Sequence, residues 1–104
     1  MQVATCLSCA QLDDVFHAIA APARRAILDE LYDRDGQTLF ELCARLTMKH
    51  GLSLTRQGVS QHLAVLEAAG LVTTRREGKY KFHQLDTAPL RRVAERWGVG
   101  KDPA

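Results

Sequence analysis

The spacing of apolar residues changes at Gly70, and this change limits the fold more than any other feature of the sequence. Before Gly70, apolar residues recur every three or four positions, which predicts a helix that begins after the N-cap residue Thr55. After Gly70, two short segments alternate and are rich in β-branched and aromatic residues, which predicts two strands joined by a tight turn at Glu77-Gly78. These strands are residues 71–76 and 79–85. A helix followed at once by a hairpin is therefore the centre of the expected fold.

Three more helices are expected before this pair of elements, and one after it. Each is predicted by an apolar stripe at helical spacing and by residues that favour helix ends, such as the capping box Thr38–Glu41. The other end signals are Pro22, Asp35-Gly36, His50-Gly51 and Asp86. The residues expected to face the core in the second and third helices are Ile27, Leu28, Leu31, Tyr32, Leu39, Leu42, Cys43 and Leu46. The expected fold class is mainly α with a small β-hairpin.

The length of 104 residues suits a single domain. We expect a flexible arm over residues 1–10, the domain over residues 11–98 and a C-terminal tail over residues 99–104. No apolar run is long enough to span a bilayer and the N-terminus lacks the basic segment of a secretory signal, so a cytoplasmic protein is expected. No Gly-rich phosphate loop, activated nucleophile or spaced carboxylate pair is present, so neither an enzyme nor a cofactor is expected.

The formal net charge of +2 conceals an uneven distribution of charge. Residues 11–44 contain seven acidic and three basic residues, whereas residues 45–81 contain two acidic and seven basic residues. A basic block in an otherwise balanced protein indicates a polyanionic partner. A solvated surface with no partner could carry the same charges. The positions of the basic residues therefore have to distinguish a polyanion-binding surface from a solvated one.

The helix before Gly70 carries a polar stripe on the side opposite its core-facing residues Val59, Leu63 and Leu66. Side chains of this kind hydrogen-bond to base edges when a helix enters the DNA major groove by its N-terminal end. We therefore expect this stripe to read bases, although an ordinary solvated face is the alternative. The stripe consists of Arg56, Gln57, Ser60 and Gln61.

The hairpin carries four basic residues near its tip, which are Arg75, Arg76, Lys79 and Lys81. They are expected to hold DNA phosphates, together with His62 of the preceding helix. Tyr80 and Phe82 alternate with the lysines and are expected to pack against the body of the protein. A charged hairpin that only protects a sheet edge is the alternative.

The stretch VSQHLAVLEAAGLVTTRREGKYKFHQL, with FHAIAAPARRAILDEL and LFELCARL before it, resembles the winged helix-turn-helix repressors of the ArsR/SmtB family. The resemblance covers residues 12–97 and implies a winged helix-turn-helix fold, with the hairpin as the wing. It also implies a homodimer that binds a palindromic operator on double-stranded DNA and is released by a signal. Two departures are that Ala21 stands where the family has an N-cap Asp, and that the segment 47–54 is longer than the family's turn.

The resemblance implies that the first and last helices join two copies of the chain. Apolar stripes on both helices agree with this, because neither stripe has another expected partner. The residues expected at the dimer interface are Leu12, Val15, Phe16, Ile19, Leu90, Val93, Ala94 and Trp97. A winged-helix module that docks proteins instead of DNA is the alternative function.

Many members of this family sense metals, but their ligand patterns are incomplete here. Arg45 stands where the third helix would need a second cysteine after Cys43, and Ala88 stands where the last helix would need a histidine. We expect no metal site. The alternative is a soft-metal site or thiol switch made by Cys6, Cys9 and Cys43, because C-x-x-C pairs bind soft ions and form reactive thiolates.

Overall fold

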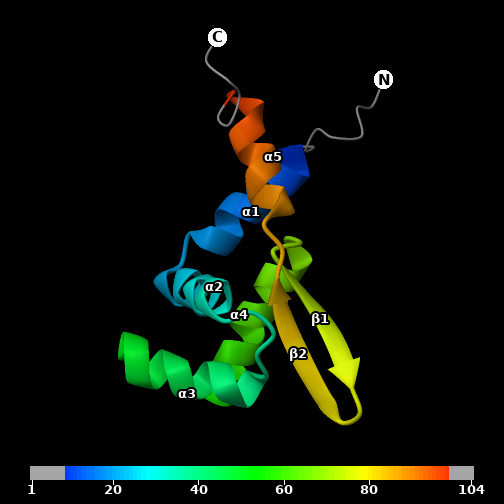
Figure 1. The fold of residues 1–104 in the computed structure, drawn as a ribbon. Helices are drawn as coiled ribbons and strands as arrows, with labels where there is room; N and C mark the ends of the chain where they lie inside the picture. Colours follow the sequence, from blue (N-terminus) through cyan, green and yellow to red (C-terminus); the bar gives the residue numbers. More distant parts are fainter. Residues whose placement is uncertain (1–8, 99–104) are drawn as a thin grey trace.

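The computed structural model describes residues 9–98, and it confirms the predicted order of four helices, a hairpin and a closing helix (Figure 1). The helices are α1 (Cys9–Ile19), α2 (Pro22–Asp33), α3 (Leu39–His50), α4 (Arg56–Ala68) and α5 (Ala88–Arg96). The strands are β1 (Val72–Glu77) and β2 (Tyr80–Leu85). Helices α1 and α5 lie side by side at one end of the molecule, and the tip of the hairpin projects at the other (Figure 1). None of the helices within residues 9–98 has the length and apolar character that a membrane span requires.

Helices α2, α3 and α4 pack around one apolar core, which the start of β1 closes. Its largest side chains are at most 2% exposed, and removing each such chain from water stabilises the fold by about 1.5–3 kcal/mol. They are Ile27, Leu31, Leu42, Leu46, Leu63, Leu66 and Leu71. The predicted inward residues of α4 are therefore confirmed.

The ends of α3 and α4 follow the predicted capping. The Thr38 Oγ1 atom accepts from the Glu41 backbone N–H at 3.2 Å, and the Glu41 carboxylate accepts from the Thr38 N–H at 2.9 Å. At the start of α4, Thr55 Oγ1 accepts from the Gly58 N–H at 2.9 Å. Gly51 after α3 has a φ of 65°, a left-handed conformation that glycine adopts without a Cβ clash.

Tyr32 was expected to face the core, and this expectation is wrong: the side chain is 83% exposed. The buried stripe of α2 is Ala26, Ile27, Glu30 and Leu31, so the inward position that follows Ile27 by three residues belongs to a glutamate. Tyr32 lies one residue beyond Leu31 and is therefore turned about 100° around the helix, toward solvent.

The turn of the hairpin lies one residue later than predicted. Glu77 pairs with Tyr80, so the two turn residues are Gly78 and Lys79. Gly78 has a φ of 61°, and no non-glycine residue in the described chain has a positive φ. A glycine in the first turn position is what a type II′ turn requires, and this turn matches the twist of the strands.

The faces of the hairpin also differ from the prediction. Cross-strand partners share a face, and Val72 pairs with Leu85 while Thr74 pairs with His83. Val72 and His83 are 2% and 5% exposed, so their face is the one that packs on the body. Tyr80 and Phe82 belong to the opposite face, and Tyr80 is 56% exposed. The expectation that the two aromatic rings pack against the body is therefore wrong.

The wing is attached to the loop between α2 and α3. The backbones of Gln37 and His83 exchange two hydrogen bonds of 3.1 and 2.7 Å, and His83 Nδ1 lies 3.1 Å from the Gln37 carbonyl oxygen. The Leu85 N–H donates to the Asp35 carboxylate at 2.7 Å. These bonds join the root of the wing to the α2–α3 loop, and β1 also contacts α4, so the two elements expected to contact DNA are connected through the body of the protein.

Candidate nucleic-acid interface

The outer face of α4 is polar and free of large apolar groups. Its side chains are exposed, whereas Val59, Leu63 and Leu66 on the opposite face are buried. The exposed set is Arg56, Gln57, Ser60 and Gln61, all predicted from the sequence. Three of these four side chains lie in the first turn and a half of the helix, the part that enters a major groove first in helix-turn-helix docking.

Gly58 lies within this first turn although glycine weakens a helix interior. A Cβ atom at this position would come within 3.1 Å of the Thr55 hydroxyl oxygen, which caps the helix. Glycine therefore leaves room for the cap, and the cap fixes the N-terminal end of the polar stripe.

Three of the four basic residues of the wing divide between its two faces, and the fourth, Lys79, lies in the turn. Arg75 lies on the outer face, where its guanidinium pairs with Glu77 and is stacked 5.1 Å from the centre of the Phe82 ring. Arg76 and Lys81 are direct cross-strand partners, and they lie on the same face of the hairpin as Val72 and His83. Like charges placed directly opposite each other destabilise a hairpin. A bound polyanion would remove this cost.

A groove of about 490 Å³ separates the wing from the beginnings of α3 and α4. Arg56 and Ser60 line it from α4, and Lys79 and Lys81 line it from the wing. Leu63, His83 and the exposed ring of Phe40 also border it. Three cations from two elements and one acidic residue, Glu67 of α4, thus border this groove beside the polar stripe of α4, and the excess of positive charge suits a sugar-phosphate backbone.

His62 was predicted to contact phosphate, but its ring lies on a different side of α4. Its Nδ1 atom is 3.2 Å from the Arg24 guanidinium. Burial and the positive charge of Arg24 lower the pKa of His62 below its ordinary value, so the ring is neutral at pH 7. His62 therefore does not belong to the surface expected to contact DNA.

The residues predicted at the dimer interface differ in their exposure. Phe16 and Trp97 are 43% and 63% exposed, and both lie at the end of the molecule that α1 and α5 form. Val15 is 1% exposed and is thus enclosed within its own chain. The half-buried members of the set are Leu12, Ile19, Leu90, Val93 and Ala94. Two exposed aromatic side chains, Phe16 and Trp97, therefore lie at the end of the molecule that α1 and α5 form.

Cys43 is half-buried and packs against the core. Burial raises the pKa of its thiol, and the charge of Arg56 opposes this only in part, so the thiol is protonated at neutral pH. Within residues 9–98, no three His, Cys, Asp or Glu side chains form a group that could hold a metal ion. The expectations for Cys6 and for the side chain of Cys9 lie outside the described residues.

Changing Cys6, Cys9 and Cys43 together to serine is expected to leave the affinity for duplex DNA unchanged, with or without metal. Metal binding needs thiolates, and the Cys43 thiol is held in its protonated form. The measurement is the ultraviolet absorption of wild type and triple variant on titration with Cd(II). A thiolate-to-metal band in the wild type that the triple variant lacks would show that the cysteines form a site.

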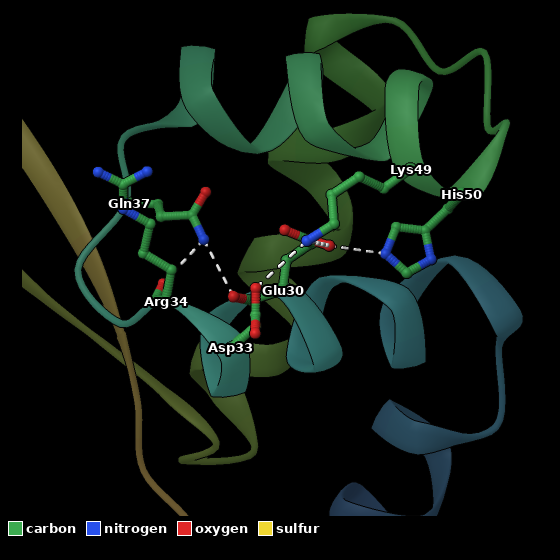
Figure 2. A network of polar contacts seen from close by, with 6 residues as sticks. All are labelled: Glu30, Asp33, Arg34, Gln37, Lys49 and His50. Carbon is green, nitrogen blue, oxygen red and sulfur yellow. Dashed lines mark hydrogen bonds and ion pairs between the residues drawn. The ribbon is translucent and has the colours of Figure 1, made fainter.

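A buried polar network joins α2 to the C-terminal end of α3 (Figure 2). The Glu30 carboxylate, 2% exposed, accepts from Lys49 Nζ at 3.2 Å and from His50 Nε2 at 2.9 Å. The Gln37 amide donates to the backbone carbonyls of Glu30 and Arg34 at 3.0 and 2.8 Å. This network was not predicted from the sequence. Its one signal is an acidic residue at an inward position of α2, three residues after Ile27.

Comparison with known proteins gives consistent matches. A family model described as a helix-turn-helix domain matches residues 19–75. The uncharacterized HTH-type transcriptional regulator YuzN of Bacillus subtilis (strain 168) is 47% identical over 85 residues, which are 82% of this chain and 92% of YuzN. The transcriptional repressor SdpR of the same organism is 30% identical over 79 residues, which are 76% of this chain and 80% of SdpR.

Solved structures share the fold. An ArsR-like transcriptional regulator from Rhodococcus sp. RHA1 superimposes with a TM-score of 0.73 at 32% identity, over 85% of this chain and 74% of that one. The homodimeric winged helix-turn-helix DNA-binding domain Mb0332 from Mycobacterium bovis, a possible ArsR-family transcriptional regulator, gives a TM-score of 0.65 at 25% identity. The match covers 85% of this chain and 78% of Mb0332.

Proposed function

Because the chain belongs to the ArsR family of winged helix-turn-helix transcriptional regulators, we propose that it is a repressor that binds a palindromic operator as a homodimer. In this proposal α4 reads base edges in the major groove, and the wing holds the adjacent backbone. The repressor named among its relatives and the homodimeric structure support the two parts of the proposal. Such a regulator acts where the DNA is, in the cytoplasm.

One observation supports the DNA surface most directly, the pairing of Arg76 with Lys81 beside the groove that Arg56 also lines. Two cations on adjacent strands repel each other in the free protein, and a phosphate between the wing and α4 turns that repulsion into attraction. The polar stripe of α4 then lies next to the bound backbone. The proposed base-reading residues are Gln57, Ser60 and Gln61, and the proposed phosphate contacts are Arg75, Arg76, Lys79 and Lys81. We add Arg56 to the phosphate contacts, although it was expected from the sequence to read bases, because it lines the groove together with Lys79 and Lys81.

Base reading and phosphate holding are expected to respond differently to mutation. Gln61→Ala should weaken binding to the preferred operator by about 1–3 kcal/mol and binding to random duplex much less, because only a base contact depends on sequence. Lys79→Ala should weaken both duplexes equally and reduce the slope of log affinity against log salt by about one. The measurement is binding of each variant to both duplexes over a salt series.

Arg91→Ala is the matched control for Lys79→Ala. Arg91 is an exposed base on α5, the helix that lies at the end of the molecule away from the wing tip (Figure 1). This variant should keep the wild-type salt slope. If Lys79→Ala also keeps that slope, the wing is only a charged sheet edge. A wild type that binds no duplex would favour the protein-docking alternative.

A further inference from the structure

We propose that Arg24 is a positioning residue that fixes the recognition helix α4 relative to α1, and thereby sets the spacing of the two half-sites that the dimer accepts. The inference rests on the proposed function, because half-site spacing matters only for a dimer that binds an operator. It gives a role to a residue that belongs neither to the proposed DNA contacts nor to the expected dimer interface. Its basis is one guanidinium in the first turn of α2 that contacts two other helices.

The contacts of Arg24 are specific in geometry. Its Nε atom donates to the Ala18 carbonyl at 2.8 Å, and its Nη2 atom donates to the His17 carbonyl at 3.0 Å. Both carbonyls belong to the last turn of α1, where helix carbonyls lack partners within the helix and carry the negative end of the helix dipole. The third contact, from Nη1 to His62 Nδ1 at 3.2 Å, reaches the middle of α4.

The protonation state of His62 follows from this geometry. A guanidinium can only donate hydrogen bonds, so Nδ1 of His62 must accept with its lone pair. The imidazole is then neutral and carries its proton on Nε2. The half-buried surroundings of both side chains favour this state, because a protonated ring would place two cations about 3 Å apart.

Arg25, the next residue of α2, shows which of the Arg24 contacts does more than cap α1. Arg25 donates to the Ile19 carbonyl at 2.9 Å and so also caps the end of α1. Among the described residues, Arg25 makes no hydrogen bond to α4. Capping of α1 is therefore shared by two arginines, whereas of these two only Arg24 also hydrogen-bonds to α4.

This connection matters for a dimer that binds two half-sites. The first and last helices join the two copies, and each copy places one α4 in a major groove, with the two grooves one helical turn of DNA apart. The angle between α1 and α4 then determines the distance between the two recognition helices. The Arg24 fork, with two bonds to α1 and one to α4, adds a directional restraint on this angle to the packing of α1 against α4.

The test measures tolerance to altered half-site spacing. An operator selected from a random duplex pool would be compared with two versions whose half-sites are one base pair closer or farther apart. Lysine keeps the charge at position 24 but lacks the planar fork, so Arg24→Lys should reduce the wild-type penalty for altered spacing by roughly 2- to 30-fold. Arg25→Lys is the matched control and should retain the full penalty.

His62→Leu tests the same connection without disturbing the caps of α1. It removes the acceptor on α4, leaves both Arg24 bonds to α1 and should reduce the spacing penalty as Arg24→Lys does. The nitrogen resonances of the His62 imidazole provide a readout that needs no DNA: the wild type should show an unprotonated Nδ1, and Arg24→Lys should lose this preference.

The outcomes separate the inference from the proposed function. If Arg24→Lys lowers thermal stability but keeps the full spacing penalty, Arg24 only caps α1 and the inference is wrong. A protonated Nδ1 in the wild type would contradict it as well. A wild type that binds none of the duplexes would refute the proposed function and this inference with it, whereas an unchanged spacing penalty in both variants would refute the inference alone.

Discussion

Replacing Phe16 with glutamate is expected to convert the dimer to a monomer and to weaken operator binding by about 10²- to 10⁴-fold. Phe16 lies on α1 and is 43% exposed, and the proposed partner copy would cover its ring. A carboxylate at this position would be buried in the proposed apolar interface, which costs several kcal/mol. Each monomer would then bind one half-site alone and lose the gain that linking two binding events provides.

Sedimentation would report the mass of the variant, and binding to a full operator and to a single half-site would report the loss of linkage. Tyr32→Glu is the matched control, since this aromatic ring lies on α2 and is 83% exposed. It should remain dimeric with wild-type affinity. Trp97→Glu should behave as Phe16→Glu does. If both remain dimeric, the copies join through another surface.

The fold could be predicted from the sequence because its signals are local. The change of apolar spacing at Gly70 separates helix from hairpin, and the Thr38 and Thr55 caps fix where α3 and α4 begin. The polar stripe of α4 was predicted for the same reason: Gln57 and Gln61 lie one turn apart and on the side away from Leu63. Each of these features depends on residues within a few positions of one another.

The orientation of the wing could not be predicted in this way. Alternation along β2 defines two sets of side chains, but it does not say which set faces the body. Apolar character favoured Tyr80 and Phe82, whereas the structure places His83 inward, because its ring and backbone bond to Gln37, a residue 46 positions earlier. A hydrogen-bond partner this distant leaves no pattern in the sequence.

Glu30 and Arg24 were missed for a related reason. Both are charged residues in an amphipathic helix, and spacing alone assigns such residues to the solvent-facing side. Glu30 is nevertheless 2% exposed because Lys49 and His50 from α3 supply cationic and hydrogen-bonding partners for it. The segment 47–54 that looked too long for the turn is explained in part by this contact, since α3 continues to His50 and places both partners beside Glu30.

Removing both partners of Glu30 at once, with Lys49→Met and His50→Leu, is expected to lower the free energy of unfolding by about 3–5 kcal/mol at neutral pH. The cost arises because the Glu30 carboxylate stays buried with nothing to neutralise it, while Oε1 already lacks a hydrogen-bond partner in the described structure. The affected part is the packing of α2 against α3 that supports α4 (Figure 2). Urea unfolding of wild type and variant would measure the difference.

The pH dependence distinguishes this cause from a simple packing defect. In the wild type, burial tends to raise the pKa of Glu30, but the hydrogen bonds and charges of His50 and Lys49 outweigh it and lower the pKa below its ordinary value of 4.5. The contacts of Glu30 with His50 and Lys49 therefore stabilise the fold above pH 4.5, and this contribution is lost as the pH falls below that value. In the double variant only burial remains and raises the pKa. Stability should then increase as the pH falls from 7 toward 4.5, a range in which the contribution of Glu30 to the wild type is constant.

Adding Glu30→Leu to the double variant supplies the decisive comparison. An apolar side chain of similar size removes the unpaired charge, so the triple variant should recover most of the lost free energy of unfolding and should show no pH dependence from this site. The recovery is expected because all three positions would then pack as part of the apolar contact between α2 and α3. If the triple variant is no more stable than the double variant at pH 7, the loss comes from the packing of residues 49 and 50, and the buried charge of Glu30 is not its cause.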